Sequence, residues 1–422
     1  MRVFKFGGAS VKSADAVKNV AKVLREYGDG PLVVVVSAMG KMTNKMEELA
    51  DAYYYEKKTK TNILEEVKSF HQNIIQELKI DEYDYYEVEN LLIELECMIE
   101  KKRDVSSPFD MEYDRIVPFG ELISTKIISI YLNKIGYINR WIDARNFVIT
   151  TEKNRAANVL WDECVPLINN SLKPLANKQT IITQGFIGRG LNHKNTTLGR
   201  EGSDYTAAIF AFALDAESVT IWKDVSGVMN ADPRKFEDAT LIPLLSYNEA
   251  IELAYYGASV IHPKTIQPLK NKKIPLYVKS FVDPTLSGTE VRENDSRTLN
   301  ETQCYIVKEN QSVVTIASKD FSFIVEDNLE LIFKAFNESG VQLNLMQNSA
   351  ISFIGCFSTD EMKKGKLVAS LNEKFGVKIN DGYTLLTVFN YNEGSSEVDA
   401  VVGDRNIELE QKSNSALQLV LK

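Results

Sequence analysis

The sequence is poor in the residues that build metal sites and disulfide frameworks. Its 422 residues include three histidines and four isolated cysteines, with no CxxC pair. This spacing excludes a zinc-finger or disulfide scaffold and predicts buried thiols in a reducing compartment. No run of about 18 apolar residues occurs, and the N-terminus carries no apolar signal segment. We therefore expect a cytoplasmic protein without a membrane anchor.

An excess of positive charge is also missing. Lys and Arg number 49 against 58 Asp and Glu, which gives a net charge of −9. This balance argues against a nucleic-acid partner, which favours a basic face. A phosphate ligand stays compatible with it, because phosphate needs only a few local cations, backbone N–H groups and a metal ion.

The order of apolar segments predicts a large α/β domain followed by a smaller one. Short β-rich runs at residues 3–6 and 32–36 flank a helical stretch at 14–27, which is the order of a βαβ unit with parallel strands. Strands and helices keep alternating to about residue 285. A polar segment then interrupts the pattern, so we predict a first domain over 1–290 and a linker over 291–311.

The remaining residues predict a ferredoxin-like module. Over 312–390 the pattern reads β-α-β-β-α-β. Residues 391–422 add two further strands without a convincing helix, so we predict a truncated portion of a second such module there.

The end of the first strand combines a cation with two glycines. Lys5 precedes Gly7 and Gly8 at what would be the carboxyl edge of a parallel sheet, where open α/β sheets bind ligands. The glycines would let backbone N–H groups approach a phosphate, and Lys5 would add positive charge. A plain strand-to-helix turn with a surface lysine explains these residues equally well.

Two later segments add to this signal. Residues 197–208, TLGREGSDYTAA, open a helix whose N-terminus would attract an anion, with Arg200 able to grip a carboxylate and Asp204 able to orient a lysine. Simple helix capping by Ser203 or Asp204 is the compatible alternative. Residues 222–234, WKDVSGVMNADPR, place alternating charges after a strand, as in a loop that faces a nucleotide.

Taken together, these segments resemble the aspartate kinases of the amino-acid kinase family. The resemblance runs in order from Lys5 to about Glu290 through KFGGAS, VVVSAMGKMTN, PFGELIS, WIDAR, ITQGFIG, TTLGREGSDYTAA, IWKDVSGVMNADPR, ELAYYGASVIHP and PLYVKSF. It implies an α/β sandwich with a mainly parallel sheet, Mg-ATP as phosphoryl donor and L-aspartate as acceptor. The product would be 4-phospho-L-aspartate, the first intermediate towards lysine, threonine and methionine.

The resemblance also implies roles for individual residues. Catalysis would fall to Lys5 and Asp204, with no protein ligand to a metal, because the magnesium would be bound through the nucleotide. The aspartate substrate would be held by Thr43, Glu121, Arg200 and Ser203. The ATP contacts would come from Lys5, Gly7, Gly8, Ser37, Lys223, Asp224, Arg234 and Lys264.

This chain departs from the family pattern at several places. Ser259 stands where many relatives carry a phosphate-binding lysine, and we hypothesise that Lys223 or Lys264 restores that charge. The C-terminal module resembles the ACT domains that sense amino acids, but Asn344 replaces an expected aspartate and the second ACT unit is shortened. These changes count against feedback by lysine or threonine without deciding whether either amino acid inhibits, and we expect a homodimer.

Two other functions stay open at this point. Acetylglutamate, glutamate and uridylate kinases share the glycine-rich start and the parallel sheet, although the ACT-like module and the GREGSDYTAA segment favour aspartate. A catalytically idle sensor is the alternative from another class, and the missing lysine at Ser259 is its one support.

Overall fold

The computed structural model describes the chain except for residues 259–260, 294–301, 320–321, 392–397 and 399–400. The predicted departure at Ser259 lies outside the described residues. The chain divides into two compact units. The N-terminal unit comprises Met1–Val228, Leu241–Ile251 and Val260–Asp295, and the C-terminal unit comprises Met229–Thr240, Glu252–Ser259 and Ser296–Lys422.

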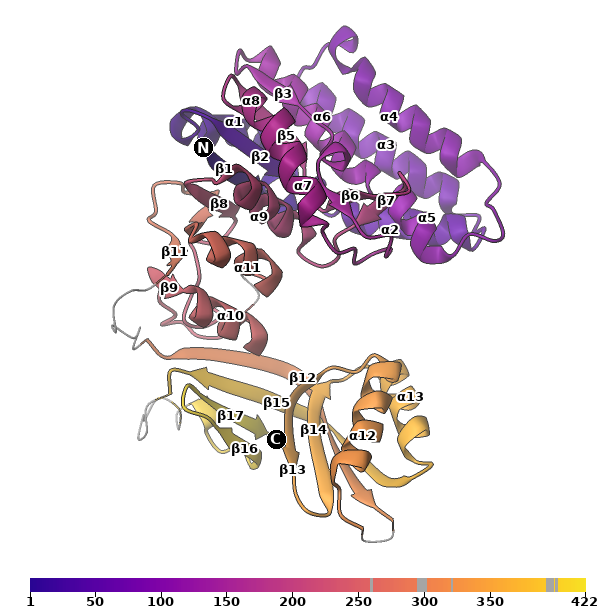
Figure 1. The fold of residues 1–422 in the computed structure, drawn as a ribbon, viewed down its shortest axis with the longest axis vertical. Helices are drawn as coiled ribbons and strands as arrows, with labels where there is room; N and C mark the ends of the chain where they lie inside the picture. The colour runs from indigo at the N-terminus through magenta and orange to yellow at the C-terminus, as the bar shows by residue number, and fades with distance from the viewer. Residues whose placement is uncertain (259–260, 294–301, 320–321, 392–397, 399–400) are drawn as a thin grey trace. The chain divides into compact units, whose positions relative to one another are not determined.

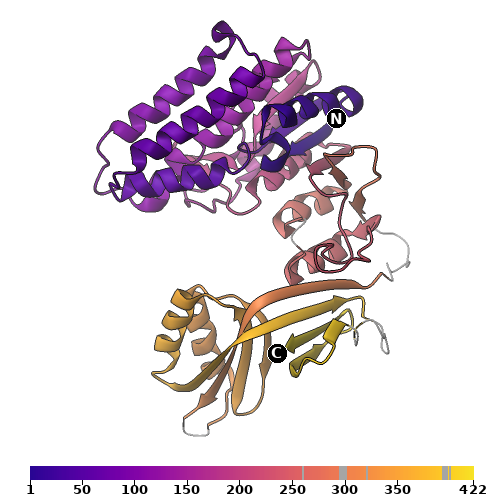
Figure 2. The same cartoon turned by 180° about the vertical axis from the view of Figure 1, so that it is seen from behind.

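An eight-stranded sheet forms the centre of the N-terminal unit (Figures 1 and 2). Its strands, in spatial order, are β3 (Asn139–Trp141), β5 (Thr180–Gln184), β2 (Leu32–Val36), β1 (Arg2–Phe6), β8 (Ser218–Lys223), β10 (Leu276–Ser280), β11 (Thr289–Arg292) and β9 (Leu244–Ser246). Neighbouring strands are parallel except for the β10–β11 pair. A second sheet consists of β4 (Ile149–Thr150), β6 (Ile187–Gly190) and β7 (Asn195–Thr197).

Helices cover this sheet and extend beyond one end of it (Figure 1). They are α1 (Ala14–Tyr27), α2 (Met42–Tyr54), α3 (Lys60–Glu77), α4 (Glu82–Glu100), α5 (Phe109–Ile116), α6 (Phe119–Lys134), α7 (Trp161–Leu167), α8 (Lys173–Ala176), α9 (Gly202–Leu214) and α11 (Pro263–Lys272), while α10 (Tyr247–Tyr256) contributes to both units. The helix α9 packs on β1, β2 and β8, and α6 packs on β2, β3 and β5.

The local sequence explains why these elements form. The run LVVVV of β2 is buried at every position, as a central strand of a covered parallel sheet requires. The helix α9 reads GSDYTAAIFAFAL and is buried nearly all round, and its small alanines allow close approach to the strands. Ser13 caps α1 by accepting a hydrogen bond from the backbone N–H of Ala16.

Parallel register brings several strand ends to one edge of the sheet. Phe6 pairs with Val36 on one side and with Trp222 on the other. The segments that follow β1, β2 and β8 therefore leave the sheet side by side. This edge carries the first glycine segment and, after β2, Ser37.

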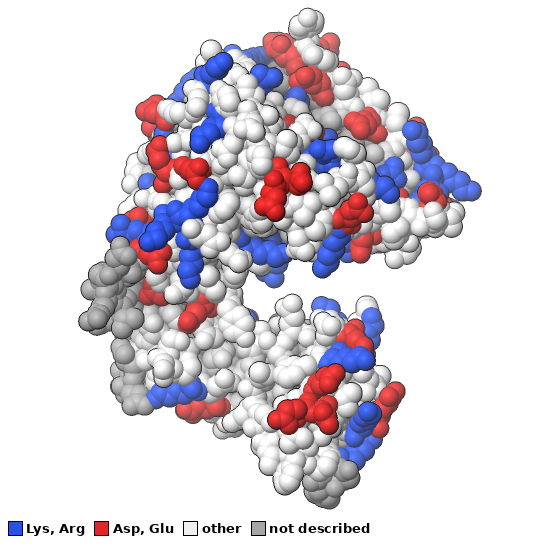
Figure 3. Space-filling model, in the orientation of Figure 1, with Lys and Arg blue, Asp and Glu red and all other residues white. Residues whose placement is uncertain are grey.

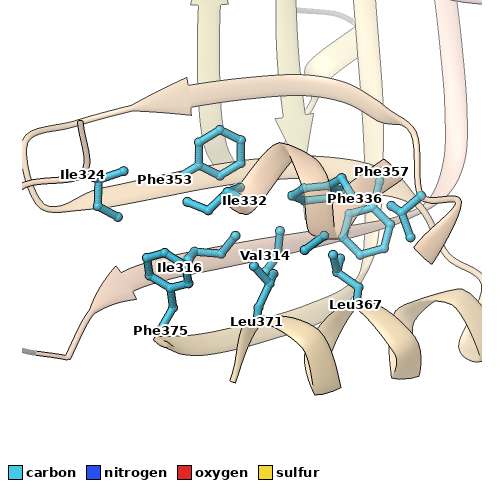
Figure 4. Close-up of a cluster of buried hydrophobic side chains, with 12 residues drawn as sticks. Val314, Ile316, Ile324, Ile332, Phe336, Phe353, Phe357, Leu367, Leu371 and Phe375 are labelled. Carbon is cyan, nitrogen blue, oxygen red and sulfur yellow. The ribbon is translucent and has the colours of Figure 1, made fainter. Parts of the chain in front are cut away.

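The C-terminal unit is built on a six-stranded antiparallel sheet in the order β13-β14-β12-β15-β17-β16. Its elements are β12 (Cys304–Ser318), α12 (Glu326–Ser339), β13 (Leu343–Asn348), β14 (Ser352–Ser358), α13 (Glu361–Leu371), β15 (Phe375–Phe389), β16 (Ile407–Lys412) and β17 (Ala416–Leu421). Twelve buried apolar residues from the strands, from α12 and α13 and from the loops beside α12 form a core, in which Val314, Phe336 and Leu367 lie together (Figure 4). The predicted fold class, a mainly parallel α/β unit followed by an α+β unit, is confirmed.

The charged side chains carry little information about partners. Acidic and basic groups are interspersed over the face shown in Figure 3, as the net charge of −9 leads one to expect. Within the described residues, no helix combines the length and the apolar character needed to cross a membrane.

Candidate active site

Three predicted residues form a buried charge cluster at the carboxyl edge of the large sheet. Lys5 of β1 places its Nζ 2.5 Å from Oδ1 of Asp204, which lies in the first turn of α9. Lys223, at the end of β8, places its Nζ 3.4 Å from the other oxygen, Oδ2. Burial acts to raise the pKa of Asp204, but the two ammonium groups outweigh it and hold that pKa below its ordinary value. The carboxylate is therefore ionised between two lysines.

The glycine segment after β1 packs closely against the segment after β2. The backbone N–H of Gly40 donates to the carbonyl of Gly8 at 2.9 Å. A Cβ at Gly8 would lie 2.6 Å from the carbonyl oxygen of Gly40 and 3.0 Å from that of Ala38, so this position excludes any larger residue. A Cβ at Gly7 would make only ordinary contact, at 3.5 Å from the Nζ of Lys5. Steric exclusion therefore applies to the second glycine alone.

The carboxylate of Glu121 lies beside this segment, in the first turn of α6, and its side chain is fully buried. Its Oε1 accepts hydrogen bonds from the backbone N–H of Ala38 at 3.3 Å and from the hydroxyl of Thr43 at 3.4 Å. Its Oε2 is buried without a hydrogen-bond partner in the described part of the chain. Burial raises the pKa of Glu121 to about 8, against the opposing effect of these hydrogen bonds.

The loop before α9 has an unusual backbone. Gly199 and Glu201 both adopt left-handed conformations, with φ of 79° and 55°. The turn lets the N–H of Gly202 donate to the carbonyl of Gly199 at 3.0 Å and starts the helix at Gly202. Ser203 packs tightly against Gly185, because a Cβ added at Gly185 would lie 2.5 Å from the Cβ of Ser203. This loop presents Arg200 and the helix N-terminus, where an anion is stabilised.

These groups surround one cavity of about 540 Å³ within the N-terminal unit. Eight of the predicted site residues line it: Lys5, Gly8, Ser37, Thr43, Glu121, Arg200, Ser203 and Asp204. Gly7 precedes Gly8 in the chain, and Lys223 reaches the cavity's edge through Asp204. The volume is large enough for a ligand much bigger than water, and the charged groups that line the cavity suit a substrate with both carboxylate and phosphate groups.

Three other predicted residues do not line this cavity. The side chain of Asp224 is exposed. Arg234 belongs to the C-terminal unit and pairs with Asp232 at 2.8 Å while 88% of its side chain is exposed. Lys264 lies in the first turn of α11, where its backbone N–H donates to Nδ1 of His262, the residue that caps this helix. Their contact with a nucleotide stays a prediction, as do the roles assigned above to the residues that line the cavity.

Sequence reasoning missed a further group that lines the cavity. Asn44, Glu47, Tyr113, Arg155 and Phe186 come from four separate segments. Asn44 and Phe186 lie in the segments VVVSAMGKMTN and ITQGFIG quoted above, although no role was given to them there. No quoted segment contains Glu47, Tyr113 or Arg155, so the signal for these three residues is spatial. In the part of the chain that the structure describes, no three His, Cys, Asp or Glu side chains cluster as a protein-only metal site would need.

Comparison with known proteins gives a consistent result. The amino acid kinase family matches residues 1–280. Aspartokinase 2, chloroplastic, of Arabidopsis thaliana is 32% identical over 384 residues, which cover 88% of this chain and 69% of the relative; two other Arabidopsis aspartokinases are covered over 62% and 63% of their length. Lysine-sensitive aspartokinase 3 of Escherichia coli is 30% identical over 397 residues, 92% of this chain and 86% of the relative.

The structural match covers both units. E. coli aspartokinase III, solved in complex with aspartate and ADP, aligns with a TM-score of 0.85 and 28% identity over 100% of this chain and 96% of its own. The aspartate kinase of Clostridium acetobutylicum shares the fold, with a TM-score of 0.79 and 22% identity. The chain belongs to the aspartokinases of the amino acid kinase family.

Proposed function

We propose that the protein transfers the γ-phosphoryl group of ATP to the side-chain carboxylate of L-aspartate, giving 4-phospho-L-aspartate and ADP. The observation that carries this proposal is the single cavity that combines the Lys5–Asp204–Lys223 cluster with Glu121 and Arg200. One end supplies cations for a transferring phosphoryl group. The other supplies a carboxylate for an ammonium and a guanidinium for a carboxylate.

The proposed reaction does not require the protein to remove a proton from the acceptor. An aspartate side chain with a pKa of about 3.9 is already ionised near neutral pH, so no general base is needed to activate it. Its oxygen attacks the γ-phosphorus, the new O–P bond forms as the bond to the leaving ADP oxygen breaks, and the negative charge departs with ADP. Catalysis then rests on positioning and on neutralising charge.

The cluster at the sheet edge is suited to that neutralisation. The buried side chain of Lys5 is fixed by its ion pair with Asp204, and Lys223 adds a second cation on the far oxygen of the same carboxylate. We assign Lys5 to the oxygens of the transferring group. Lys223 is the candidate for the charge that Ser259 does not provide.

Magnesium fits this arrangement when the nucleotide carries it. Asp204 pairs with both lysines, and among the described residues no group of three His, Cys, Asp or Glu side chains could hold a metal ion. A protein-only magnesium cage is therefore not formed there, but the site suits an ion that keeps its phosphate and water ligands. Bound there with ATP, Mg²⁺ would neutralise charge on the β- and γ-phosphates. Asp204 would orient the ion through its water ligands, while the nucleotide supplies its direct ligands.

The acceptor is assigned to the part of the cavity around Glu121. Its carboxylate lies between the N–H of Ala38 and the hydroxyl of Thr43, and its free Oε2 can accept from an ammonium group. We assign the acceptor's α-carboxylate to Arg200, in the loop before α9, and to Ser203, in the first turn of that helix. An acceptor without an amino group, such as succinate, would leave the buried Oε2 of Glu121 unpaired and should bind poorly.

A hydroxamate assay tests the proposal directly. Purified protein with Mg-ATP, hydroxylamine and L-aspartate should give aspartyl hydroxamate, and the Lys5→Met variant should not. Parallel reactions with glutamate, acetylglutamate and UMP examine the other kinases considered above. No turnover with any acceptor, together with retained ATP binding, would favour an idle sensor. A homodimer built on the ACT-like unit is part of the proposal and is checked by light scattering.

A further inference from the structure

One wall of the cavity is a stack of side chains that the proposed chemistry does not use. The guanidinium carbon of Arg155 lies 4.4 Å from the centre of the Tyr113 ring, on α5. The hydroxyl of Tyr113 donates to Oε1 of Glu47, on α2, at 2.5 Å. All three residues line the cavity. The planar cation is therefore fixed on a ring that is itself held by a carboxylate.

The backbone beneath this stack is also fixed. Arg155 has a φ of 61°, a left-handed conformation that is uncommon for residues other than glycine, asparagine and aspartate. The buried carboxylate of Asp114 accepts hydrogen bonds from the backbone N–H of Arg155, from the side chain of Asn154 and, at 2.8 Å, from the hydroxyl of Thr197. Asp114 thus ties residue 155 to the start of the loop that carries Arg200. Strain held in place by buried partners is a feature of ligand-binding positions.

The stack adjoins the acceptor part of the cavity rather than the lysine cluster. Glu47 follows Thr43 by one turn of α2, so their side chains are neighbours on one helix face. On the other side, the carbonyl oxygen of Arg155 lies close to Gly199, at 3.1 Å from where its Cβ would stand, and Gly199 precedes Arg200. Arg155 is therefore flanked by segments that carry two residues assigned to the acceptor.

We propose that Arg155 is a specificity-determining residue that binds the α-carboxylate of the acceptor, as a second guanidinium beside Arg200. This inference rests on the proposed function and concerns its acceptor. In the present structure Arg155 pairs with Asp110 through one contact of 3.3 Å, with 47% and 57% of the two side chains exposed. Such an exposed pair is weak, so a carboxylate inside the cavity can replace it. The planar guanidinium suits a bidentate grip on that carboxylate.

The test uses the Arg155→Gly variant, which removes the guanidinium and relieves the left-handed backbone. We expect the KM for aspartate to rise about 10- to 100-fold, the range for loss of a charged hydrogen-bonded pair. The kcat and the KM for ATP should stay within about twofold. Arg155→Lys should recover part of the loss, because lysine keeps the charge but not the planar fork.

A change in the acceptor identifies the group that is bound. The α-amide of aspartate keeps the reacting carboxylate and the amine but lacks the α-carboxylate. With this acceptor the effect of Arg155→Gly should shrink to less than about threefold. An equal effect on both acceptors would overturn the proposal, as would an unchanged KM for aspartate.

Arg103→Ala is the matched control. Arg103 lies over the ring of Tyr54, with 4.3 Å from its guanidinium carbon to the ring centre, but it does not line the cavity. Its loss should leave the KM for aspartate unchanged. Calorimetric titration of aspartate into the wild type and Arg155→Gly gives the same comparison without turnover. If the wild type binds aspartate more tightly than Arg155→Gly does but shows no turnover, the proposed function is refuted and this inference is not. If the wild type turns over aspartate and the KM for aspartate is the same in Arg155→Gly, this inference is refuted and the proposed function is not.

Discussion

The buried carboxylate of Glu121 leads to a prediction in which stability and activity move in opposite directions. Its pKa is raised to about 8 from an ordinary value of 4.5, because burial disfavours the charged form. Between these two values the folded state binds the proton more tightly than the unfolded state does. The free energy of unfolding therefore falls as the pH rises through this window, and it is level above about 8.

The magnitude follows from the width of the window. Each pH unit within this window changes the free energy of unfolding by about 1.4 kcal/mol, so the wild type loses about 3 kcal/mol of that free energy between pH 5.5 and 8. Glutamine does not titrate, and its side-chain oxygen can still accept from Ala38 and Thr43. Glu121→Gln should thus be more stable than the wild type at pH 8.5, with an advantage that shrinks by about 3 kcal/mol on going to pH 5.5.

Urea denaturation at pH 5.5, 7 and 8.5 measures this difference. Glu48→Gln, which changes an exposed carboxylate that pairs with Lys45 on the surface of the same unit, is the control and should show a small, nearly level difference. In the kinase assay Glu121→Gln should raise the KM for aspartate, because a neutral amide replaces the partner of the ammonium. A difference in the free energy of unfolding between Glu121→Gln and the wild type that stays constant from pH 5.5 to 8.5 would refute the reasoning. It would mean that burial does not raise the pKa of Glu121.

Three further substitutions test other parts of the site. Asp204→Asn removes the buried carboxylate that both Lys5 and Lys223 contact, so we expect a loss of about 3–5 kcal/mol in urea denaturation and a fall in kcat of at least about 10²-fold. Gly8→Ala places a Cβ against the carbonyl of Gly40, so it should lower the free energy of unfolding by about 1–3 kcal/mol and raise the KM for ATP. Gly30→Ala is the control, because no atom lies within 4 Å of its added Cβ, and it should leave the KM for ATP unchanged. Lys223→Met should lower kcat/KM for ATP by about tenfold in the hydroxamate assay, and an unchanged value would remove Lys223 from phosphate binding.

The sequence was sufficient to predict which residues come together where a glycine-containing motif lies at the end of a strand or the start of a helix. Lys5 and Asp204 are 199 positions apart, yet both belong to glycine-containing segments at a strand end or a helix start. Parallel register then brings the ends of β1 and β8 together, and α9 packs on both strands. The grouping of these segments could be predicted because the same physical rule, ligand binding at the carboxyl edge of a parallel sheet, applies to each of them. The aspartokinase function was predicted from the resemblance of the quoted segments to that family, and not from this rule.

The outer wall of the cavity could not be predicted in this way. Glu47, Tyr113 and Arg155 come from two helices and a turn, and each has an ordinary structural explanation in sequence: a charged helix face, an apolar helix position and a surface arginine. The left-handed backbone at Arg155 depends on Asp114, which is 41 positions away. Local preference gives no hint of that conformation, because tertiary hydrogen bonds impose it.

The length of strand β12 could not be predicted from the local sequence either. The segment from Lys308 to Gln311 is polar, which predicts a loop, and we expected the strand to begin at residue 312. In the structure β12 begins at Cys304 and continues through this segment, with an irregular register between Lys308 and Gln311 and a left-handed Asn310. A β-bulge lets polar residues interrupt the alternation without ending the strand.

The polar segment also explains how the ACT-like unit tolerates its changed residue. Asn344 stands where an aspartate was expected, and its side-chain oxygen accepts from the Nζ of Lys308 at 2.8 Å while its amide donates to Gln311 at 2.8 Å. Burial lowers the pKa of Lys308. An aspartate here could pair with that lysine but could not donate to the Oε1 of Gln311, whereas asparagine serves both neighbours. The substitution is therefore accommodated by a network within the chain, and the bulge that sequence patterns obscure is what brings Lys308 and Gln311 to the same neighbour.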